Sequence, residues 1–233
     1  MQMEAEIGER LAGVRARMAA AAKGCGRRPE DIHLVAVGKT HPVEAIAAAI
    51  EAGAAIIGES YVQEARAKYD ALAQQPVQWH FIGRLQTNKA KYAVRMFDLI
   101  HTVDSLKLGA ELDRQAQKAG KVQQLLIQVN MGSEAQKAGV TPDAAPDLAL
   151  DLSGLSHIKV KGLMAIPPYF DDPERARPHF AALRALRDRI AALAIPQIDM
   201  MVLSMGMTGD FEAAIEEGAT LVRIGSAIFG ERS

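Results

Sequence analysis

The sequence has almost no cysteine and almost no net charge. Cys25 is the single cysteine among 233 residues, which excludes an internal disulfide framework and a metal site built from several thiolates. A lone thiol fits a reducing compartment, and we expect the protein in the cytoplasm. Lys and Arg number 27 against 28 Asp and Glu, so the formal charge is -1 and a general attraction to nucleic acid is not expected.

Long apolar runs are also missing. Charged residues are scattered through residues 1–24, so this segment lacks the apolar core of a signal peptide or a membrane span. The 6 histidines show no H-x-H or H-E-x-x-H spacing, and we expect neither a metal nor a membrane partner. With 49% apolar and 24% charged residues, the composition is that of a globular protein rather than a disordered or fibrous one.

A short β-branched segment followed by an Ala-rich helical segment recurs along the chain. The first helix is predicted over residues 3–23, where Ile7, Leu11, Val14 and Met18 share one face. Strands are then predicted at residues 33–39, 55–58, 78–83, 99–103, 124–130, 158–166, 198–204 and 221–225. Helices are predicted between them at residues 42–53, 61–72, 88–96, 105–119, 142–152, 174–193 and 211–217.

Eight strand–helix units in one direction predict a parallel sheet, because each helix supplies a crossover between parallel strands. Eight strands in a chain of this length favour one closed (β/α)8 TIM barrel over residues 1–233, with the first helix as an addition. An open doubly wound sheet is the alternative. That fold shows a glycine-rich first turn, whereas residues 38–42 contain a single glycine, Gly38. No linker or low-complexity segment interrupts the pattern, and we expect one domain.

Residues at the ends of the predicted strands are the candidates for function, because a barrel places its chemistry at the carboxyl ends of its strands. Lys39 ends the first strand, where a desolvated lysine can lose its proton and form an imine with an aldehyde. Gly206 and Gly225 follow the last two strands and precede helical segments, an arrangement that favours an anion such as phosphate. The alternatives are a solvated turn lysine and ordinary strand-end glycines.

Arg223 interrupts an otherwise apolar strand. A period of two puts Leu221 and Arg223 on the same face, which would direct the guanidinium into the barrel. A buried guanidinium needs either an ion pair or a ligand, and the sequence leaves both open. The carboxylates that could pair with it are Asp199, Glu59 and Asp104. We interpret the two histidines within predicted strands, at positions 80 and 101, as hydrogen-bonded core groups.

Six segments together resemble one protein family. They are residues 35–40 (VAVGKT), 58–64 (GESYVQE), 79–89 (WHFIGRLQTNK), 162–166 (GLMAI), 204–207 (SMGM) and 222–230 (VRIGSAIFG). In these segments the chain resembles the pyridoxal phosphate homeostasis proteins, which are single-barrel relatives of the N-terminal domain of alanine racemase. The resemblance runs from the first predicted strand to the last residues.

The resemblance implies a cofactor site. It implies that Lys39 carries pyridoxal 5'-phosphate as an internal aldimine, that Arg223 faces the pyridine nitrogen, and that Met164 packs near the ring. The phosphate would be held, partly through backbone N–H groups, by Ser204, Gly206, Met207, Gly225 and Ser226. The chain departs from the family at Ser60, where the family usually has asparagine.

An arginine at the ring nitrogen disfavours protonation of that nitrogen, which makes the ring a weaker electron sink. Racemisation also needs acid–base groups on both faces, and none of Tyr61, Tyr69, Tyr92 and Tyr169 matches the tyrosine that related racemases recruit from a second domain. We therefore expect a monomeric carrier or buffer of pyridoxal phosphate, without catalytic turnover, that serves vitamin B6 and amino-acid homeostasis. Pyridoxal phosphate-dependent apoenzymes are the expected recipients.

Two other functions remain open from the sequence. One is a low-activity amino-acid racemase or lyase that uses the same cofactor. The other is a cofactor-free aldolase that forms a Schiff base directly with its substrate through Lys39. An aldolase of that kind has no need of a cation against a pyridine ring, so the role of Arg223 distinguishes it from the carrier.

Overall fold

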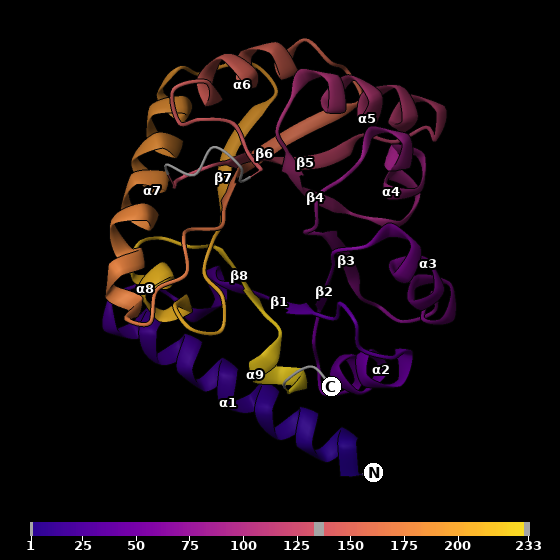
Figure 1. Cartoon of the computed structure of the whole chain (residues 1–233), viewed down its shortest axis with the longest axis vertical. Coiled ribbons are helices and arrows are strands. Elements are labelled where there is room, and N and C mark those ends of the chain that lie inside the picture. The colour runs from indigo at the N-terminus through magenta and orange to yellow at the C-terminus, as the bar shows by residue number, and fades with distance from the viewer. Residues whose placement is uncertain (1, 133–137, 231–233) are drawn as a thin grey trace.

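The computed structural model describes residues 2–132 and 138–230 and shows a closed barrel of eight strands (Figure 1). Neighbouring strands are parallel, and β1 closes the barrel by pairing with β8. The strands are β1 (His33–Val37), β2 (Ile56–Glu59), β3 (Gln78–Phe81), β4 (Leu99–Val103), β5 (Gln123–Val129), β6 (Ile158–Ala165), β7 (Ile198–Ser204) and β8 (Leu221–Ile224). The predicted (β/α)8 barrel is confirmed, and the open sheet is excluded.

Helices surround the barrel and connect successive strands (Figure 1). The α-helices are α1 (Gln2–Gly24), α2 (Val43–Glu51), α3 (Val62–Ala71), α4 (Ala90–Met96), α5 (Leu106–Lys118), α6 (Ala145–Ser153), α7 (Arg177–Ala192), α8 (Phe211–Glu216) and α9 (Ser226–Phe229). Short 3-10 turns are η1 (Pro29–Asp31), η2 (Thr87–Lys89) and η3 (Pro173–Ala176). Within the described ranges every helix is too short or too polar to cross a bilayer.

Two helices start three residues later than the sequence predicted, and prolines explain the difference. The helix predicted from residue 142 begins at Ala145, with Pro146 in its first turn. The helix predicted from residue 174 begins as the η3 turn and becomes α-helical at Arg177, directly before Pro178. Proline lacks an N–H group and is tolerated in a first turn, where that group has no intrahelical acceptor. Residues 131–141 lie between the predicted strand 124–130 and the predicted helix 142–152, and of these, residues 133–137 lie outside the described ones.

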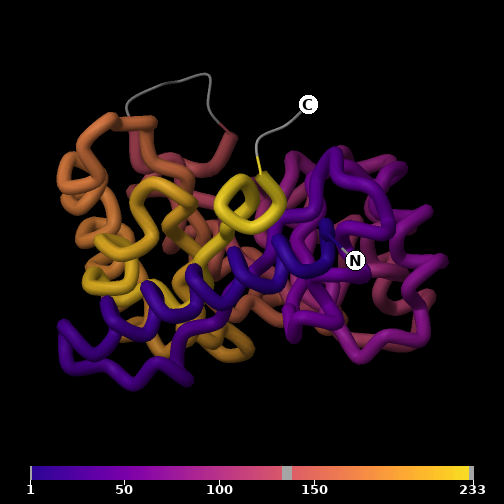
Figure 2. The backbone as a smooth tube through the Cα atoms, turned by 90° about the horizontal axis from the view of Figure 1, so that it is seen from below, coloured from indigo at the N-terminus to yellow at the C-terminus, as the bar shows by residue number. Residues whose placement is uncertain are grey.

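The additional helix α1 lies along the outside of the barrel, across α2, α8 and α9 (Figures 1 and 2). Its predicted apolar face is confirmed, because Ile7, Leu11, Val14 and Met18 are all buried. Arg15 Nη2 also donates a hydrogen bond to the carbonyl oxygen of Gly53 at 2.5 Å. The helix therefore covers the junction at which the first and last strands meet.

The barrel interior contains both an apolar cluster and buried polar side chains. The apolar part consists of Val35, Ile56, Leu99, Leu126, Met164 and Leu221. Side chains alternate along a strand, so His101 and Arg223, two positions beyond Leu99 and Leu221, point into the barrel as well. Both are buried, with 0% of His101 and 4% of Arg223 exposed. The predicted placement of Leu221 and Arg223 on one face is thus confirmed.

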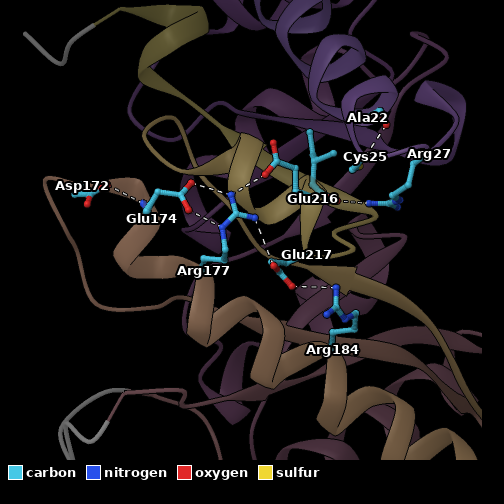
Figure 3. Close-up of polar contacts among 10 residues, drawn as sticks. Ala22, Cys25, Arg27, Asp172, Glu174, Arg177, Arg184, Glu216 and Glu217 are labelled. Atoms are coloured by element: carbon cyan, nitrogen blue, oxygen red, sulfur yellow. Dashed lines mark hydrogen bonds and ion pairs between the residues drawn. The ribbon is translucent and has the colours of Figure 1, made fainter.

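An arginine–glutamate network joins the segment after β6 to the helix after β7 (Figure 3). Arg177 donates hydrogen bonds to Glu174 Oε1 at 2.8 Å and to Glu216 Oε2 at 2.6 Å, and it lies 3.4 Å from Glu217 Oε1. Arg184, two turns further along α7, pairs with Glu217 Oε2 at 3.0 Å. These contacts hold α7 against α8 and so position the two loops that lead into these helices.

Candidate functional site

A cavity of about 310 Å³ opens at the carboxyl ends of β1, β6, β7 and β8. Of the residues predicted to form a cofactor site, Lys39, Met207, Arg223, Gly225 and Ser226 line it. The remaining wall comes largely from the loop after β6, which contributes Pro168, Tyr169, Phe170 and Pro173. The network around Arg177 fixes this loop, so the cavity has one wall from the β6–α7 loop and another from the loops after β7 and β8.

Lys39 follows β1 after one residue, Gly38, and is half-buried at the cavity wall. Val37, the last residue of β1, lines the cavity beside it. The next part of the loop is held against the end of the chain, because the rings of His41 and Phe229 stack with centroids 4.9 Å apart. From the sequence, Lys39 could also have been a fully solvated turn residue. The structure instead places it on the wall of a cavity, where it is half-buried.

The loops after β7 and β8 are joined to each other. Gly206 has a φ of +90°, and a Cβ atom there would lie 2.6 Å from the Cβ of Ala214, so a larger residue does not fit. The backbone N–H of Arg223 donates to the carbonyl oxygen of Gly206 at 3.0 Å. Ser226 Oγ donates to Thr208 Oγ1 at 3.3 Å. The two loops consequently form one continuous part of the cavity wall.

Asp210 is a polar neighbour in this wall that the sequence reasoning did not single out. Its Oδ1 accepts a hydrogen bond from the backbone N–H of Met207 at 2.6 Å, and the residue lines the cavity. Burial raises the pKa of Asp210. An anion on the Met207 side would meet this carboxylate, whereas Gly225 and Ser226 on the other side of the wall carry no charge.

Arg223 binds neutral oxygens rather than a carboxylate. Its Nη1 donates to Ser204 Oγ at 2.7 Å and its Nη2 to the carbonyl oxygen of Ala165 at 3.0 Å. Two carboxylates named as alternatives have lysine partners, since Asp199 pairs with Lys161 and Glu59 with Lys68. Burial lowers the pKa of Arg223 to about 10, so the guanidinium stays charged at neutral pH. Among residues 2–132 and 138–230 Arg223 forms no ion pair, although the charge of Asp210 raises its pKa, and Arg223 lines the cavity.

A hydrogen-bonded chain continues from Arg223 across the barrel. Ser204 Oγ lies 2.9 Å from Nδ1 of His101, whose Nε2 lies 3.0 Å from Nδ1 of His80. Burial lowers the pKa of His80 to about 3, and burial together with the charge of Arg223 holds the pKa of His101 well below its usual range. Both histidines are therefore neutral. Their interpretation as hydrogen-bonded core groups is confirmed.

The other predicted site residues lie beneath the cavity rather than on its surface. Ser204 is fully buried behind Arg223. Met164 is fully buried and packs among the apolar interior residues, including Leu126. Gly206 is buried at the back of the β7 loop. The structure thus brings these side chains together as a floor under the cavity.

A cluster of buried charges lies behind Lys39 and was not recognised from the sequence. Glu59 at the end of β2 is fully buried and accepts a hydrogen bond from Lys68 Nζ at 2.8 Å. Glu64 accepts one from the same nitrogen at 2.8 Å. The sequence does contain an indication of this cluster, because Glu64 and Lys68 are four residues apart on one helix and the strand before that helix ends at Glu59. The sequence does not show that all three meet at the first strand.

The residues on the cavity fit a phosphorylated aldehyde better than a metal ion. A lysine amine and a buried cation face the same space, and the volume is within the range of small-molecule sites. Neutral hydrogen-bonding groups at Gly225 and Ser226 complete the wall. In residues 2–132 and 138–230, no group of three or more His, Cys, Asp or Glu side chains could hold a metal ion.

Comparisons with known proteins agree with this geometry. Residues 11–233 match the family model of the alanine racemase N-terminal domain. The chain is similar to the pyridoxal phosphate homeostasis protein of Aquifex aeolicus, with 45% identity covering 96% of this chain and 97% of the relative. The protein of the same name from Escherichia coli K12 is 42% identical, covering 97% of each chain.

A solved structure of PipY from Synechococcus elongatus, with pyridoxal phosphate bound, superimposes with a TM-score of 0.84 at 37% identity. The superposition covers 96% of this chain and 100% of PipY. Fold, site and sequence similarity extend over nearly the whole chain. The protein therefore belongs to the alanine racemase N-terminal domain family, and within that family to the pyridoxal phosphate homeostasis proteins.

Proposed function

We propose that this protein binds pyridoxal 5'-phosphate covalently through Lys39 and carries or buffers the cofactor for vitamin B6 and amino-acid homeostasis. The observation that carries the proposal is the placement of Lys39 and the charged, buried Arg223 on one cavity of about 310 Å³. Pyridoxal phosphate bound in the related PipY structure supports the choice of cofactor.

Different residues of the chain have different roles in binding the cofactor. When bound, pyridoxal phosphate supplies an aldehyde carbon, to which a lysine nitrogen bonds as water leaves. Lys39 provides that nitrogen. Arg223 is fixed by Ser204 and the Ala165 carbonyl and keeps its proton, so a ring nitrogen beside it stays unprotonated. Gly225 and Ser226 offer uncharged donors to the phosphate.

The residues beneath the cavity have supporting roles in this proposal. Ser204 and Gly206 hold Arg223 through its side chain and its backbone N–H. Met164 would support the site from the apolar barrel interior, where it is fully buried. Met207 contributes its position on the cavity wall, and its amide becomes available to the phosphate if Asp210 releases it.

The test is titration of the purified protein with pyridoxal phosphate, followed by absorbance. We expect a new visible band in the wild type and in Lys107→Ala, a control that removes an exposed lysine from α5. We expect the band to be lost in Lys39→Ala. A band of full intensity in Lys39→Ala would contradict the assignment.

Catalytic turnover is not expected from this site. Tyr169 does line the cavity, but 84% of it is exposed, so its hydroxyl is not held at a defined position. A racemase needs acid–base groups placed on both faces of the cofactor. Incubation with L-alanine and pyridoxal phosphate should therefore yield no D-alanine by circular dichroism, for the wild type and for Tyr169→Phe alike. Conversion that disappears in Tyr169→Phe would favour the racemase alternative.

We further propose that residues 1–233 form one cytoplasmic domain that acts as a monomer and delivers pyridoxal phosphate to apoenzymes. Cys25 is a free and exposed thiol, which supports a reducing compartment. The exposed apolar side chains, such as Leu150, Tyr169 and Met201, come from different elements and do not suggest a dimer interface. Reactivation of a pyridoxal phosphate-dependent apoenzyme by the loaded protein, in the presence of a scavenger of free cofactor, tests delivery.

A further inference from the structure

The backbone on both sides of Lys39 is held by one group of charged side chains, the buried Glu59 and Lys68 and the partly exposed Glu64, here called the Lys68 cluster. Lys68 Nζ donates to the carbonyl oxygen of Gly38 at 2.7 Å. On the other side of Lys39, the backbone N–H of Thr40 donates to Glu64 Oε1 at 2.5 Å. The same nitrogen of Lys68 binds Glu59 and Glu64, so one cluster contacts the residues before and after the lysine.

The segment held by the cluster has an unfavourable conformation. Thr40 has a φ of +67°, in the left-handed region. That region is disfavoured for every residue with a Cβ atom and most of all for a β-branched one. Such a conformation persists only where the surroundings enforce it. Two contacts hold it here: the Thr40 N–H bond to Glu64, and a turn hydrogen bond from the His41 N–H to the Gly38 carbonyl oxygen at 3.1 Å.

The composition of the cluster is unusual for a purely structural ion pair. Two carboxylates share one ammonium group, and Glu59 Oε2 is buried without a hydrogen-bond partner among the described residues. Lys68 is 3% exposed and Glu59 is 0% exposed. Burying such groups costs free energy that their mutual attraction offsets incompletely, so stability alone does not explain them. Their common feature is contact with the Lys39 segment.

Resting on the proposed function, we propose that the Lys68 cluster is a positioning unit that holds Lys39 in the binding conformation and thereby sets the affinity for pyridoxal phosphate. Glu59, Glu64 and Lys68 act through the backbone of Gly38 and Thr40. They fix where the Lys39 side chain leaves the strand, which decides whether its amine reaches the aldehyde opposite Arg223. Without the cluster, Thr40 relaxes to a negative φ and the Lys39 side chain leaves the strand in a different direction.

The first test needs no cofactor. Amide hydrogen exchange of the unloaded protein should show the Thr40 N–H protected in the wild type. Glu64→Gln keeps a side-chain oxygen for that N–H, whereas Glu64→Leu has none. We expect protection to survive in Glu64→Gln and to be lost in Glu64→Leu. Fast exchange of Thr40 in the wild type would overturn the proposal.

The second test measures affinity with the same pair of variants. Relaxation of one strained residue should raise the dissociation constant for pyridoxal phosphate about tenfold in Glu64→Leu, with Glu64→Gln close to the wild type. Lys68→Met, which also frees the Gly38 carbonyl, should weaken binding at least as much. Its control is Lys161→Met, which removes the half-buried ion pair between β6 and β7 and should leave the dissociation constant unchanged.

The outcomes separate this proposal from the proposed function. If the wild type does not bind pyridoxal phosphate at Lys39, the proposed function fails, while the exchange of Thr40 still reports on the cluster. If Glu64→Leu loses Thr40 protection but binds the cofactor as tightly as the wild type, the cluster does not set affinity and the proposal is overturned. If Lys68→Met does not fold, the comparison of Glu64→Leu with Glu64→Gln tests the proposal by itself.

Discussion

The buried carboxyl of Glu59 predicts an unusual pH dependence of stability. Burial raises the pKa of Glu59 from 4.5 to about 7, although Lys68 opposes the rise. The other charged group facing it is the Glu64 carboxylate, which also favours the protonated form. Between about pH 4.5 and about pH 7, Glu59 therefore holds a proton in the folded protein that it has released in the unfolded chain. The contribution of this group to stability is therefore fully present below about pH 4.5 and is lost as the pH rises through about 7.

The magnitude follows from the size of the shift. A rise from 4.5 to about 7 corresponds to about 3 kcal/mol of unfolding free energy across the whole window. Glu59→Gln removes this dependence, because the amide cannot titrate yet still offers Lys68 an oxygen. The difference in unfolding free energy between wild type and Glu59→Gln should thus fall by about 2.5 kcal/mol from about pH 5 to about pH 8.

The assay is urea unfolding of both proteins at the two pH values, followed by far-ultraviolet circular dichroism. Taking the difference between the proteins cancels the contributions of groups that both contain, including the buried histidines. A difference that stays constant with pH would show that Glu59 titrates as an ordinary exposed carboxyl. That result would refute the reasoning that burial keeps the Glu59 carboxyl protonated up to about pH 7.

Two further predictions concern the barrel interior and the β7 loop. The pKa of His80 is lowered to about 3, so its neutral form stabilises the fold above about pH 6.5 and this contribution is lost as the pH falls. His80→Asn removes the titration but keeps an acceptor for His101. In urea unfolding, its unfolding free energy should fall by about 2 kcal/mol less than that of the wild type between about pH 7 and pH 5. Gly206→Val forces a β-branched residue to a φ of +90° and against Ala214. Calorimetry should therefore show a loss of about 1–3 kcal/mol in unfolding free energy, and titration should show weaker binding of pyridoxal phosphate. Gly209→Ala, where an added Cβ meets nothing within 4 Å, should leave the stability unchanged.

The barrel and the cavity residues followed from local patterns in the sequence. Alternation along residues 221–225 placed Arg223 inside, and strand-end positions placed Lys39, Gly225 and Ser226 at one rim. These inferences need only a period of two and the rule that chemistry lies at the carboxyl ends of barrel strands. The structure adds the distances and hydrogen-bond partners of these residues, and it places Arg223 inside the barrel and Lys39, Gly225 and Ser226 on the cavity wall, as the pattern predicted.

The buried polar groups could not be predicted in the same way, because they depend on the register between strands. His80, His101 and Ser204 come from β3, β4 and β7, and their contact requires the stagger around the whole barrel. Likewise, the contact of Lys68 with Gly38 depends on how α3 is rotated against β1 and β2. Sequence periodicity predicts which face of a strand or helix a residue occupies. It does not predict the register that brings residues of distant segments into contact.

The attachment of pyridoxal phosphate to Lys39 is the central claim, and peptide mapping tests it most directly. The native protein is loaded with pyridoxal phosphate, reduced with borohydride to make the bond permanent, digested, and read by mass spectrometry. The account predicts one dominant phosphopyridoxyl adduct, on the peptide that contains Lys39. An adduct concentrated on another lysine, such as Lys89 or Lys107, with Lys39 unmodified, would contradict it.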